Sequence, residues 1–227
     1  MIYAFILSAP RSGSTLLRLT LNKMPGVIAL PETNFFAFID QHKIKKEFSS
    51  ASEKNNSIKK WVRHHSIKKW NVNHAELEKY LEGCVTNAPD LLLQTISFYL
   101  KNTLNKEEHG IKIIDKSPTH IFYQHYINDW FPGAKKLFLV RDPRDVVASL
   151  KTCSWSTSNP LTNAKVWKNG IKSMNGNDVI KYENLVADPV KEMTSVSRLL
   201  DITLDAEKFL NKQKMKLKKG ILQVRIH

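Results

Sequence analysis

The stretch SAPRSGSTLL, residues 8–17, decides the fold because it joins a short apolar run to a stretch with helical spacing. The run that begins at residue 2 is short and apolar, which predicts a buried strand over residues 2–7. Residues 15–23 predict a helix that ends before a proline–glycine pair. A turn from a strand into a helix is a common anion site, because backbone N–H groups at a helix N-terminus point at the ligand.

This turn follows the phosphate-loop pattern GxxxxGK[ST] without its lysine. Gly13 and Thr15 keep the frame of the pattern. Ser8 stands in place of the first glycine, and Ser14 stands in place of the lysine. Arg11 offers a cation from earlier in the loop, and its planar fork suits a phosphate or sulfate oxygen. We therefore interpret the turn as an anion-binding loop that needs no magnesium, the alternative being an ordinary strand–turn–helix corner.

The composition is that of a folded globular protein with anionic partners. The 227 residues are 42% hydrophobic, enough for one domain with a sizeable core. The chain has 35 Lys+Arg against 21 Asp+Glu, a formal net charge of +14 that favours nucleotides, nucleic acids, acidic polymers or membrane surfaces as partners. Two cysteines make neither a disulfide framework nor a metal quartet. No signal peptide or membrane span is indicated, so we expect a cytoplasmic protein without a metal.

Strand and helix patterns alternate along the chain. The predicted strands are residues 2–7, 27–30, 110–114, 136–140 and 178–180, and the predicted helices are 15–23, 91–104, 121–130, 189–200 and one that begins near 146. This alternation predicts a single α/β domain, residues 1–227, with a P-loop-like fold in which helices flank a central parallel sheet. Ligands bind such sheets beyond the carboxyl ends of the strands. Five chemically suitable residues follow predicted strands and indicate one active site: Arg11, Glu32, Lys116, Arg141 and Tyr182.

A basic insertion at about residues 41–80 contains the sequence SIKKW twice, at 57–61 and 66–70. We interpret this region as a mobile or helical insertion with Trp61 and Trp70 packed inward. A basic patch interleaved with tryptophan is also typical of single-stranded nucleic-acid binding. We favour a solvated helical face and expect no nucleic-acid partner, because no nucleic-acid-binding module is visible.

Several motifs resemble the sulfotransferases that use 3′-phosphoadenosine 5′-phosphosulfate (PAPS). APRSGSTLL, residues 9–17, resembles their 5′-phosphosulfate loop. LFLVRDPRDVVASL, residues 137–150, resembles their 3′-phosphate segment. Three further motifs resemble landmarks of the branch that includes tyrosylprotein, carbohydrate and polyketide-associated sulfotransferases: PETNFF, DKSPTH and IKYENLVADP.

The resemblance implies two anion sites for the donor. The 5′ end would be held by the backbone of Ser12, Gly13, Ser14 and Thr15 and by the Thr15 hydroxyl. Arg141 and Ser149 would hold the 3′-phosphate, which distinguishes PAPS from ATP. The alternative for Arg141 is a surface ion pair with Asp142 or Asp145, and for Ser149 a helix-surface hydroxyl. The sequence KLKKGILQVRIH, residues 216–227, corresponds loosely to the basic loop that commonly closes the 3′ site.

The resemblance also implies an in-line displacement in which the acceptor oxygen attacks sulfur. Such a step needs a base for the acceptor hydroxyl and cations near the leaving oxygen. We expect Glu32 to be the base, and Arg11 and Lys116 to be the cations. Histidines are rival bases because imidazole titrates near neutral pH: His120, His74 and His65. We expect Tyr182 and Glu183 to order the surroundings of the site without taking part in catalysis.

Two alternative functions stay open from the sequence. A divergent P-loop kinase would use ATP, although the loop lacks the usual lysine and Asp115 and Asp142 are ambiguous magnesium ligands. A non-catalytic nucleic-acid-binding protein would exploit the charge. For the sulfotransferase, the acceptor is a hydroxyl on a small molecule, a glycan or a peptide, and its recognition would fall to residues 35–80 and 151–177.

Overall fold

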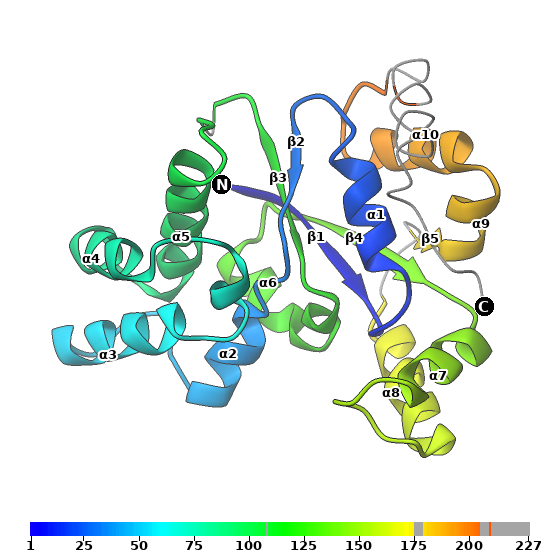
Figure 1. Ribbon diagram of the computed structural model, residues 1–227, viewed down its shortest axis with the longest axis horizontal. Helices are drawn as coiled ribbons and strands as arrows, with labels where there is room; N and C mark the ends of the chain where they lie inside the picture. The colour runs from blue at the N-terminus through cyan, green and yellow to red at the C-terminus, as the bar shows by residue number, and fades with distance from the viewer. Residues whose placement is uncertain (108, 175–178, 205–208, 210–227) are drawn as a thin grey trace.

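A computed structural model describes residues 1–107, 109–174, 179–204 and 209. In this part of the chain, five parallel strands form one sheet in the order β2-β3-β1-β4-β5, and helices cover both of its faces (Figure 1). The strands are β1 (Ile2–Ser8), β2 (Val27–Ala29), β3 (Lys112–Lys116), β4 (Lys135–Val140) and β5 (Val179–Lys181). The predicted α/β fold with a central parallel sheet is confirmed.

The helices are α1 (Ser14–Leu21), α2 (Phe35–His42), α3 (Ala51–Val62), α4 (His74–Cys84), α5 (Ala88–Asn102), α6 (Gln124–Trp130), α7 (Pro143–Lys151), α8 (Pro160–Lys172), α9 (Tyr182–Ala187) and α10 (Pro189–Leu199), with short 3₁₀ helices η1 (Ile67–Lys69) and η2 (Pro118–Tyr123). Each strand and helix predicted from the sequence is present, with ends shifted by three residues or fewer. None of the helices in the described ranges has the length and apolar character that crossing a membrane requires.

The central strand β1 divides the core into two layers. Phe5 and Leu7 belong to a cluster that also contains residues of α2 to α6. Ala4 and Ile6 belong to a second cluster, with residues of α1, α9 and α10. Successive side chains of a strand point to opposite faces of the sheet, so β1 anchors both layers and is almost wholly buried.

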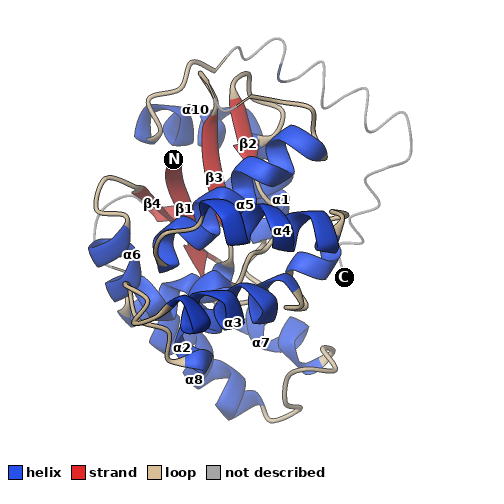
Figure 2. Ribbon diagram, turned by 90° about the vertical axis from the view of Figure 1, so that its left-hand side faces the viewer, coloured by secondary structure: helices blue, strands red, loops and turns tan. Residues whose placement is uncertain are grey.

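Register places the strand ends side by side. Phe5 and Ile6 of β1 pair with Asp115 and Lys116 of β3, and on its other side β1 pairs along its length with β4. The side view shows that the strands run toward the end of the molecule where α2, α7 and α8 lie (Figure 2). The segments that leave β1, β2, β3 and β4 therefore meet at one edge of the sheet.

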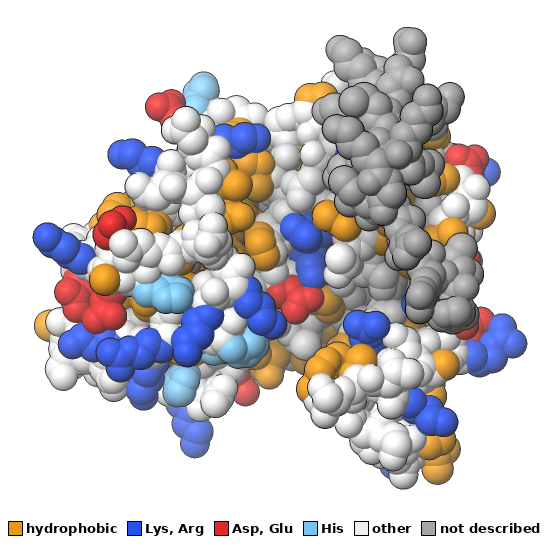
Figure 3. All heavy atoms as spheres, in the orientation of Figure 1, with side chains coloured by type: hydrophobic (Ala, Val, Ile, Leu, Met, Phe, Trp, Pro, Cys, Tyr) orange, Lys and Arg blue, Asp and Glu red, His pale blue; other side chains and the backbone are white. Residues whose placement is uncertain are grey.

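The basic region of residues 41–80 is part of the core rather than an appendage. It forms α3, η1 and α4, and both Trp61 and Trp70 are buried, as the sequence indicated. The Trp61 indole donates to the Thr95 hydroxyl at 2.9 Å, and its ring lies edge-on to Phe35, 5.1 Å between centroids. Lysines of this region, such as Lys59, are exposed. Basic side chains gather on the part of the surface where Figure 1 places α3 (Figure 3).

Candidate active site

The loop between β1 and α1 turns through residues in the left-handed conformation. Arg11 has φ 67° and Gly13 has φ 91°. A side chain at Gly13 would collide with the next element, because an added Cβ would lie 2.2 Å from Cδ2 of Tyr182. The glycine therefore meets two demands, the backbone angle and the close approach of an aromatic ring. Helix α1 begins at the next residue, Ser14, so its free N–H groups face the loop.

Arg11 joins this loop to the segment after β4. Its Nε donates a hydrogen bond to Ser149 Oγ on α7 at 2.9 Å. In the other direction, Arg141 Nη1 donates to the Arg11 carbonyl oxygen at 3.5 Å. Two segments that are 138 residues apart in the chain, and that the sequence predicts to bind the two anionic ends of a nucleotide, are thus in direct contact.

Arg141 is held from several sides. Its Nη2 pairs with Asp145 one helical turn later at 3.2 Å, and its guanidinium carbon lies 4.4 Å from the centre of the Tyr182 ring. Its carbonyl oxygen accepts from Trp167 Nε1 at 3.0 Å. The Nε atom is buried and has no hydrogen-bond partner in the described part of the chain. The ion pair with Asp145 exists, therefore, but it leaves part of the guanidinium free for another acceptor.

Two other carboxylates fix the start of α7 and the adjacent segment. Asp142 caps α7 by accepting from the Arg144 backbone N–H at 2.8 Å. Hydrogen bonds from the Arg144 side chain and backbone lower the pKa of Asp142 to about 2. Glu183 accepts from the Asp142 backbone N–H at 2.9 Å. Tyr182 and Glu183, at the start of α9, therefore contact both the segment around Arg141 and the loop at Gly13.

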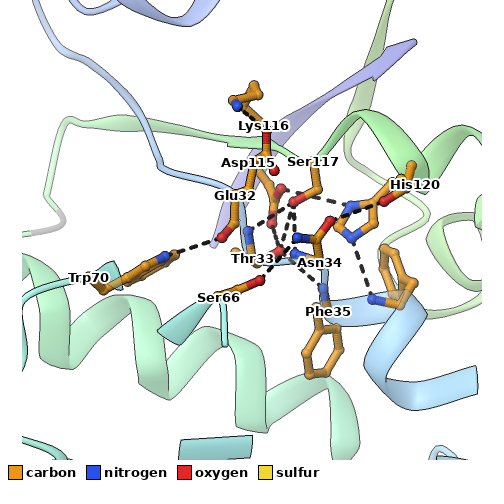
Figure 4. Close-up of polar contacts among 12 residues, drawn as sticks. Glu32, Thr33, Asn34, Phe35, Ser66, Trp70, Asp115, Lys116, Ser117 and His120 are labelled. Carbon is orange, nitrogen blue, oxygen red and sulfur yellow. Dashed lines mark hydrogen bonds and ion pairs between the residues drawn. The ribbon is translucent and has the colours of Figure 1, made fainter. Parts of the chain in front are cut away.

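Glu32 and Lys116 form an ion pair at the other side of this sheet edge. Lys116 Nζ lies 2.5 Å from Glu32 Oε1 (Figure 4). The lysine side chain is 5% exposed, whereas that of Glu32 is 46% exposed. Burial lowers the pKa of Lys116, although the bond to Glu32 opposes this effect. The Glu32 backbone is held as well, because Trp70 Nε1 donates to its carbonyl oxygen at 3.3 Å.

A buried hydrogen-bond network lies directly behind this ion pair. Thr33 Oγ1 donates to Asp115 Oδ2 at 2.6 Å. Ser117 Oγ accepts from the backbone N–H of Thr33 at 2.9 Å and of Asn34 at 3.0 Å (Figure 4). These bonds tie the segment after β2 to the end of β3. Since Glu32 precedes Thr33 and Lys116 follows Asp115, the network sets the relative position of the two charged side chains.

His120 closes the network and is fully buried, as is Asp115. Burial raises the pKa of Asp115 to about 6, against the hydrogen bonds from Thr33 and Ser117. Burial lowers the pKa of His120 to about 3. Its Nε2 accepts from the Phe36 backbone N–H at 3.4 Å, which assigns the proton to Nδ1, 3.8 Å from Asp115 Oδ1. His120 is therefore a neutral imidazole enclosed by protein.

The remaining predicted residues are those of the loop after β1, two histidines and the basic C-terminal segment. Ser12 and Ser14 are buried, whereas Thr15 is exposed at the start of α1. His65 is exposed beside Ser66. The Ser12 hydroxyl and His74 Nε2 are buried and form no hydrogen bond with any residue that the structure describes. The basic segment of residues 216–227 lies outside the described residues. Among the described residues, no group of three His, Cys, Asp or Glu side chains is placed to hold a metal ion.

Three features of the site were missed in the sequence. Thr33 and Asp115 each stand beside a predicted site residue. No local pattern indicated the hydrogen bond between them, because they are 82 residues apart in the chain. The contact of Trp70 with Glu32 has no local signal. Arg18, one turn into α1, has a side chain that no hydrogen bond or ion pair joins to a residue in the described ranges.

The arrangement is suited to binding and transferring an anionic group. Cationic and backbone donors converge at one strand edge, from Arg11, Arg141 and the start of α1. Beside them, the exposed carboxylate of Glu32 and the buried ammonium of Lys116 offer a proton acceptor and a positive charge within one hydrogen bond of each other.

Comparisons with known proteins point to one family. A model of the family described as the sulfotransferase family matches residues 4–206. A protein-tyrosine sulfotransferase of Drosophila melanogaster is 27% identical over 230 residues, which cover 92% of this chain. The match spans only 40% of that protein's length.

Solved structures share the fold. The sulfotransferase domain of the Synechococcus PCC 7002 olefin synthase superposes with a TM-score of 0.60 and 23% identity, covering 93% of this chain and 76% of that one. The sulfotransferase domain from the curacin biosynthetic pathway gives a TM-score of 0.59 and 20% identity, covering 91% and 76%.

Proposed function

The chain belongs to the sulfotransferase family, and on this premise we propose that it transfers a sulfuryl group from PAPS to an acceptor hydroxyl. Membership in the family makes the chain a transferase. The donor, the acceptor and the residue roles are the proposal. The acceptor hydroxyl belongs to a small molecule, a glycan or a peptide, and the relative from Drosophila melanogaster supports a peptide or small-molecule acceptor.

One observation carries the choice of donor, namely the hydrogen bond from Arg11 Nε to Ser149 Oγ at 2.9 Å. It brings the loop after β1 against the helix after β4, so two anion sites lie a short distance apart. A donor with a 3′-phosphate and a 5′-phosphosulfate requires such a pair. A nucleotide without a 3′-phosphate would leave the second site unused.

The residues present fit a nucleotide with two anionic ends. The backbone N–H groups of residues 12–15 and the Thr15 hydroxyl bind the 5′ end, where Gly13 permits close approach of the main chain. The buried Ser12 hydroxyl and Arg141 Nε have no hydrogen-bond partner among the described residues, so each can form a hydrogen bond with a ligand. Arg141 and Ser149 bind the 3′-phosphate.

Glu32 and Lys116 carry the chemistry at the other end of the site. The exposed Glu32 carboxylate takes the proton from the acceptor hydroxyl as the oxygen attacks sulfur in line. Lys116 and Arg11 stabilise the charge that builds on the bridging oxygen as it leaves the sulfur. Because the buried Lys116 keeps its ammonium next to Glu32, a single residue both orients the base and neutralises developing negative charge.

We assign the base to Glu32 rather than to His120. His120 is fully buried and burial lowers its pKa to about 3, so neither the acceptor nor solvent reaches its ring. The side chain of Glu32, by contrast, is 46% exposed.

The test is a binding measurement followed by an activity assay. Calorimetry with adenosine 3′,5′-bisphosphate, the desulfonated donor, should detect binding in the presence of a metal chelator, and labelled PAPS should transfer its label to a member of a panel of phenols, sugars and tyrosine peptides. No binding of the bisphosphate together with magnesium-dependent ATP turnover would reject the proposal in favour of a kinase.

A further inference from the structure

A pocket of about 250 Å³ lies where α1, β2 and the end of α5 meet. Leu30, Pro31 and Leu104 supply apolar walls, and the ring of Tyr99 supplies a flat one. Asn22 also lines the pocket, but its amide is used by the Ala29 backbone, to which it donates at 2.9 Å and from which it accepts at 2.8 Å. The amide of Asn22 is therefore not available to a ligand in this pocket.

This pocket adjoins the Glu32–Lys116 pair by two routes. Leu30 and Pro31 come directly before Glu32 in the chain. The Tyr99 ring lies 4.7 Å from the ring of Trp70, whose indole N–H donates to the Glu32 carbonyl oxygen. Figure 3 shows a hollow near the centre of the face that it draws, and basic and acidic side chains lie next to each other there.

Arg18 is one of two basic residues that line this pocket, the other being Lys106. It lines the pocket from α1 and is half-buried. No hydrogen bond or ion pair joins its side chain to any residue in the described ranges. Its charge reaches the catalytic side, since the pKa of Lys116, lowered mainly by burial, is lowered further by Arg18. A half-buried guanidinium with five free donors is suited to an oxyanion, which it binds in a bidentate way.

We propose, resting on the proposed function, that this pocket is an acceptor subsite in which Arg18 binds an oxyanion, such as a carboxylate, on a ring-sized acceptor whose hydroxyl lies at Glu32. The volume supports one ring with a short substituent, because an apolar cavity of roughly 150 Å³ already holds benzene, while larger ligands occupy roughly 300–1,000 Å³. Lys106, exposed at the rim, adds a second positive charge. The subsite is distinct from the donor sites at Arg11 and Arg141.

The subsite predicts a preference between two phenols of nearly the same shape, 4-hydroxyphenylacetate and its uncharged amide, 4-hydroxyphenylacetamide. Wild-type protein should bind the carboxylate about tenfold or more tightly than the amide in calorimetry, the scale of one charge-assisted contact. It should also show the same preference in transfer from labelled PAPS. Arg18→Gln should abolish the preference, and Arg18→Lys, which keeps the charge but not the fork, should retain part of it.

Lys79→Gln is the matched control, because it removes one positive charge from an exposed position on α4 outside the pocket. It should leave the preference unchanged. Circular dichroism and thermal melting establish that each variant is folded before binding is compared.

Three results overturn the subsite: an unchanged preference in Arg18→Gln, equal binding of the two phenols by wild-type protein, or no binding of either phenol at millimolar concentration. Failure of the donor assignment is a separate result. If adenosine 3′,5′-bisphosphate does not bind but Arg18→Gln still loses affinity for 4-hydroxyphenylacetate, the anion subsite stands and the proposed donor falls.

Discussion

Thr33 Oγ1 donates a 2.6 Å hydrogen bond to the fully buried Asp115 Oδ2, and this bond lies one residue away from both members of the Glu32–Lys116 pair. The backbone of the segment after β2 is thereby fixed to the end of β3. A network of fully buried side chains, those of Thr33, Asp115 and Ser117, thus holds the carboxylate of Glu32 beside the ammonium of Lys116.

Replacing Thr33 by valine should lower both stability and turnover. The change keeps the shape but leaves a buried carboxylate oxygen without its donor, which costs about 1–3 kcal/mol. Urea unfolding should show that loss, and kcat should fall while the affinity for adenosine 3′,5′-bisphosphate stays near that of wild-type protein. Thr33→Ser keeps the hydroxyl and should recover most of both quantities; a valine variant with wild-type kcat would remove the positioning role.

Glu32→Gln should reduce turnover by about two orders of magnitude or more, the usual scale for loss of a general base. Binding of adenosine 3′,5′-bisphosphate should hardly change, because the donor contacts that we propose are at Arg11, Arg141 and the start of α1, not at Glu32. Steady-state kinetics with labelled PAPS, alongside calorimetry, separates the two effects. Glu82→Gln, at an exposed position on α4, is the control for removing one carboxylate. Near-normal turnover in Glu32→Gln would mean that another group takes the proton.

Arg141→Ala should weaken binding of adenosine 3′,5′-bisphosphate far more than binding of 5′-AMP, by about tenfold or more for a lost charge-assisted contact. The physical reason is that only the bisphosphate has the phosphate that Arg141 would hold. Arg144→Ala removes a neighbouring guanidinium that is 88% exposed and pairs with Asp142, so it is the matched control. Equal weakening for both nucleotides would place the 3′ site elsewhere.

The buried His120 should make stability depend on pH between about 3 and 6.5. Burial lowers its pKa to about 3 in the folded protein. As the pH falls below about 6.5, the unfolded chain takes up a proton that the folded chain refuses, so the free energy of unfolding falls. Asp115 acts in the opposite sense, since burial raises its pKa to about 6 and the folded chain then holds the extra proton between about pH 4 and 6.

The variant His120→Gln, which keeps a hydrogen-bond acceptor at this position, separates these contributions. Its free energy of unfolding should fall less steeply on acidification than that of wild-type protein, by up to about 1.4 kcal/mol per pH unit for one proton. His64, whose pKa burial lowers to about 4, continues to act in the variant, so some acid sensitivity remains. Urea titrations at several pH values measure the difference. Parallel curves for the two proteins would show that His120 is charged in the folded state.

Local signals predicted the parts of the site that follow strands. The apolar run, the glycine and the arginine of the first turn are contiguous, so the loop and its position at the sheet edge could be read from one stretch. Arg141 and Lys116 likewise stand at strand ends. The pairing of Thr33 with Asp115, the indole of Trp70 on Glu32 and the pocket of Arg18 depend on packing between distant segments, which no local pattern records.

Helices α2 and α8 were not predicted from the sequence. Helix α2 was missed although Asn34, a residue type common at helix starts, directly precedes it; in the structure Asn34 has φ 52° and makes no side-chain cap. Helix α8 was missed although its signal is present: Asn159 accepts from two backbone N–H groups of the first turn, and Pro160 follows as the first helical residue. An asparagine–proline pair before an amphipathic stretch would have predicted it.

Gly13→Ala should destabilise the protein and abolish donor binding. Two penalties add, because φ 91° is strained for any residue with a Cβ and that Cβ would lie 2.2 Å from the Tyr182 ring. The strain alone costs about 1–3 kcal/mol. Since Tyr182 also stacks on Arg141, moving the ring aside would disturb the proposed 3′ site together with the loop.

Gly83→Ala is the matched change on α4, where nothing lies within 4 Å of the added atom, and there it should stabilise the helix by up to about 1 kcal/mol. Thermal unfolding and calorimetry with adenosine 3′,5′-bisphosphate on both variants make the comparison, and a Gly13→Ala protein that binds the nucleotide as tightly as wild-type protein would exclude this loop from the donor site.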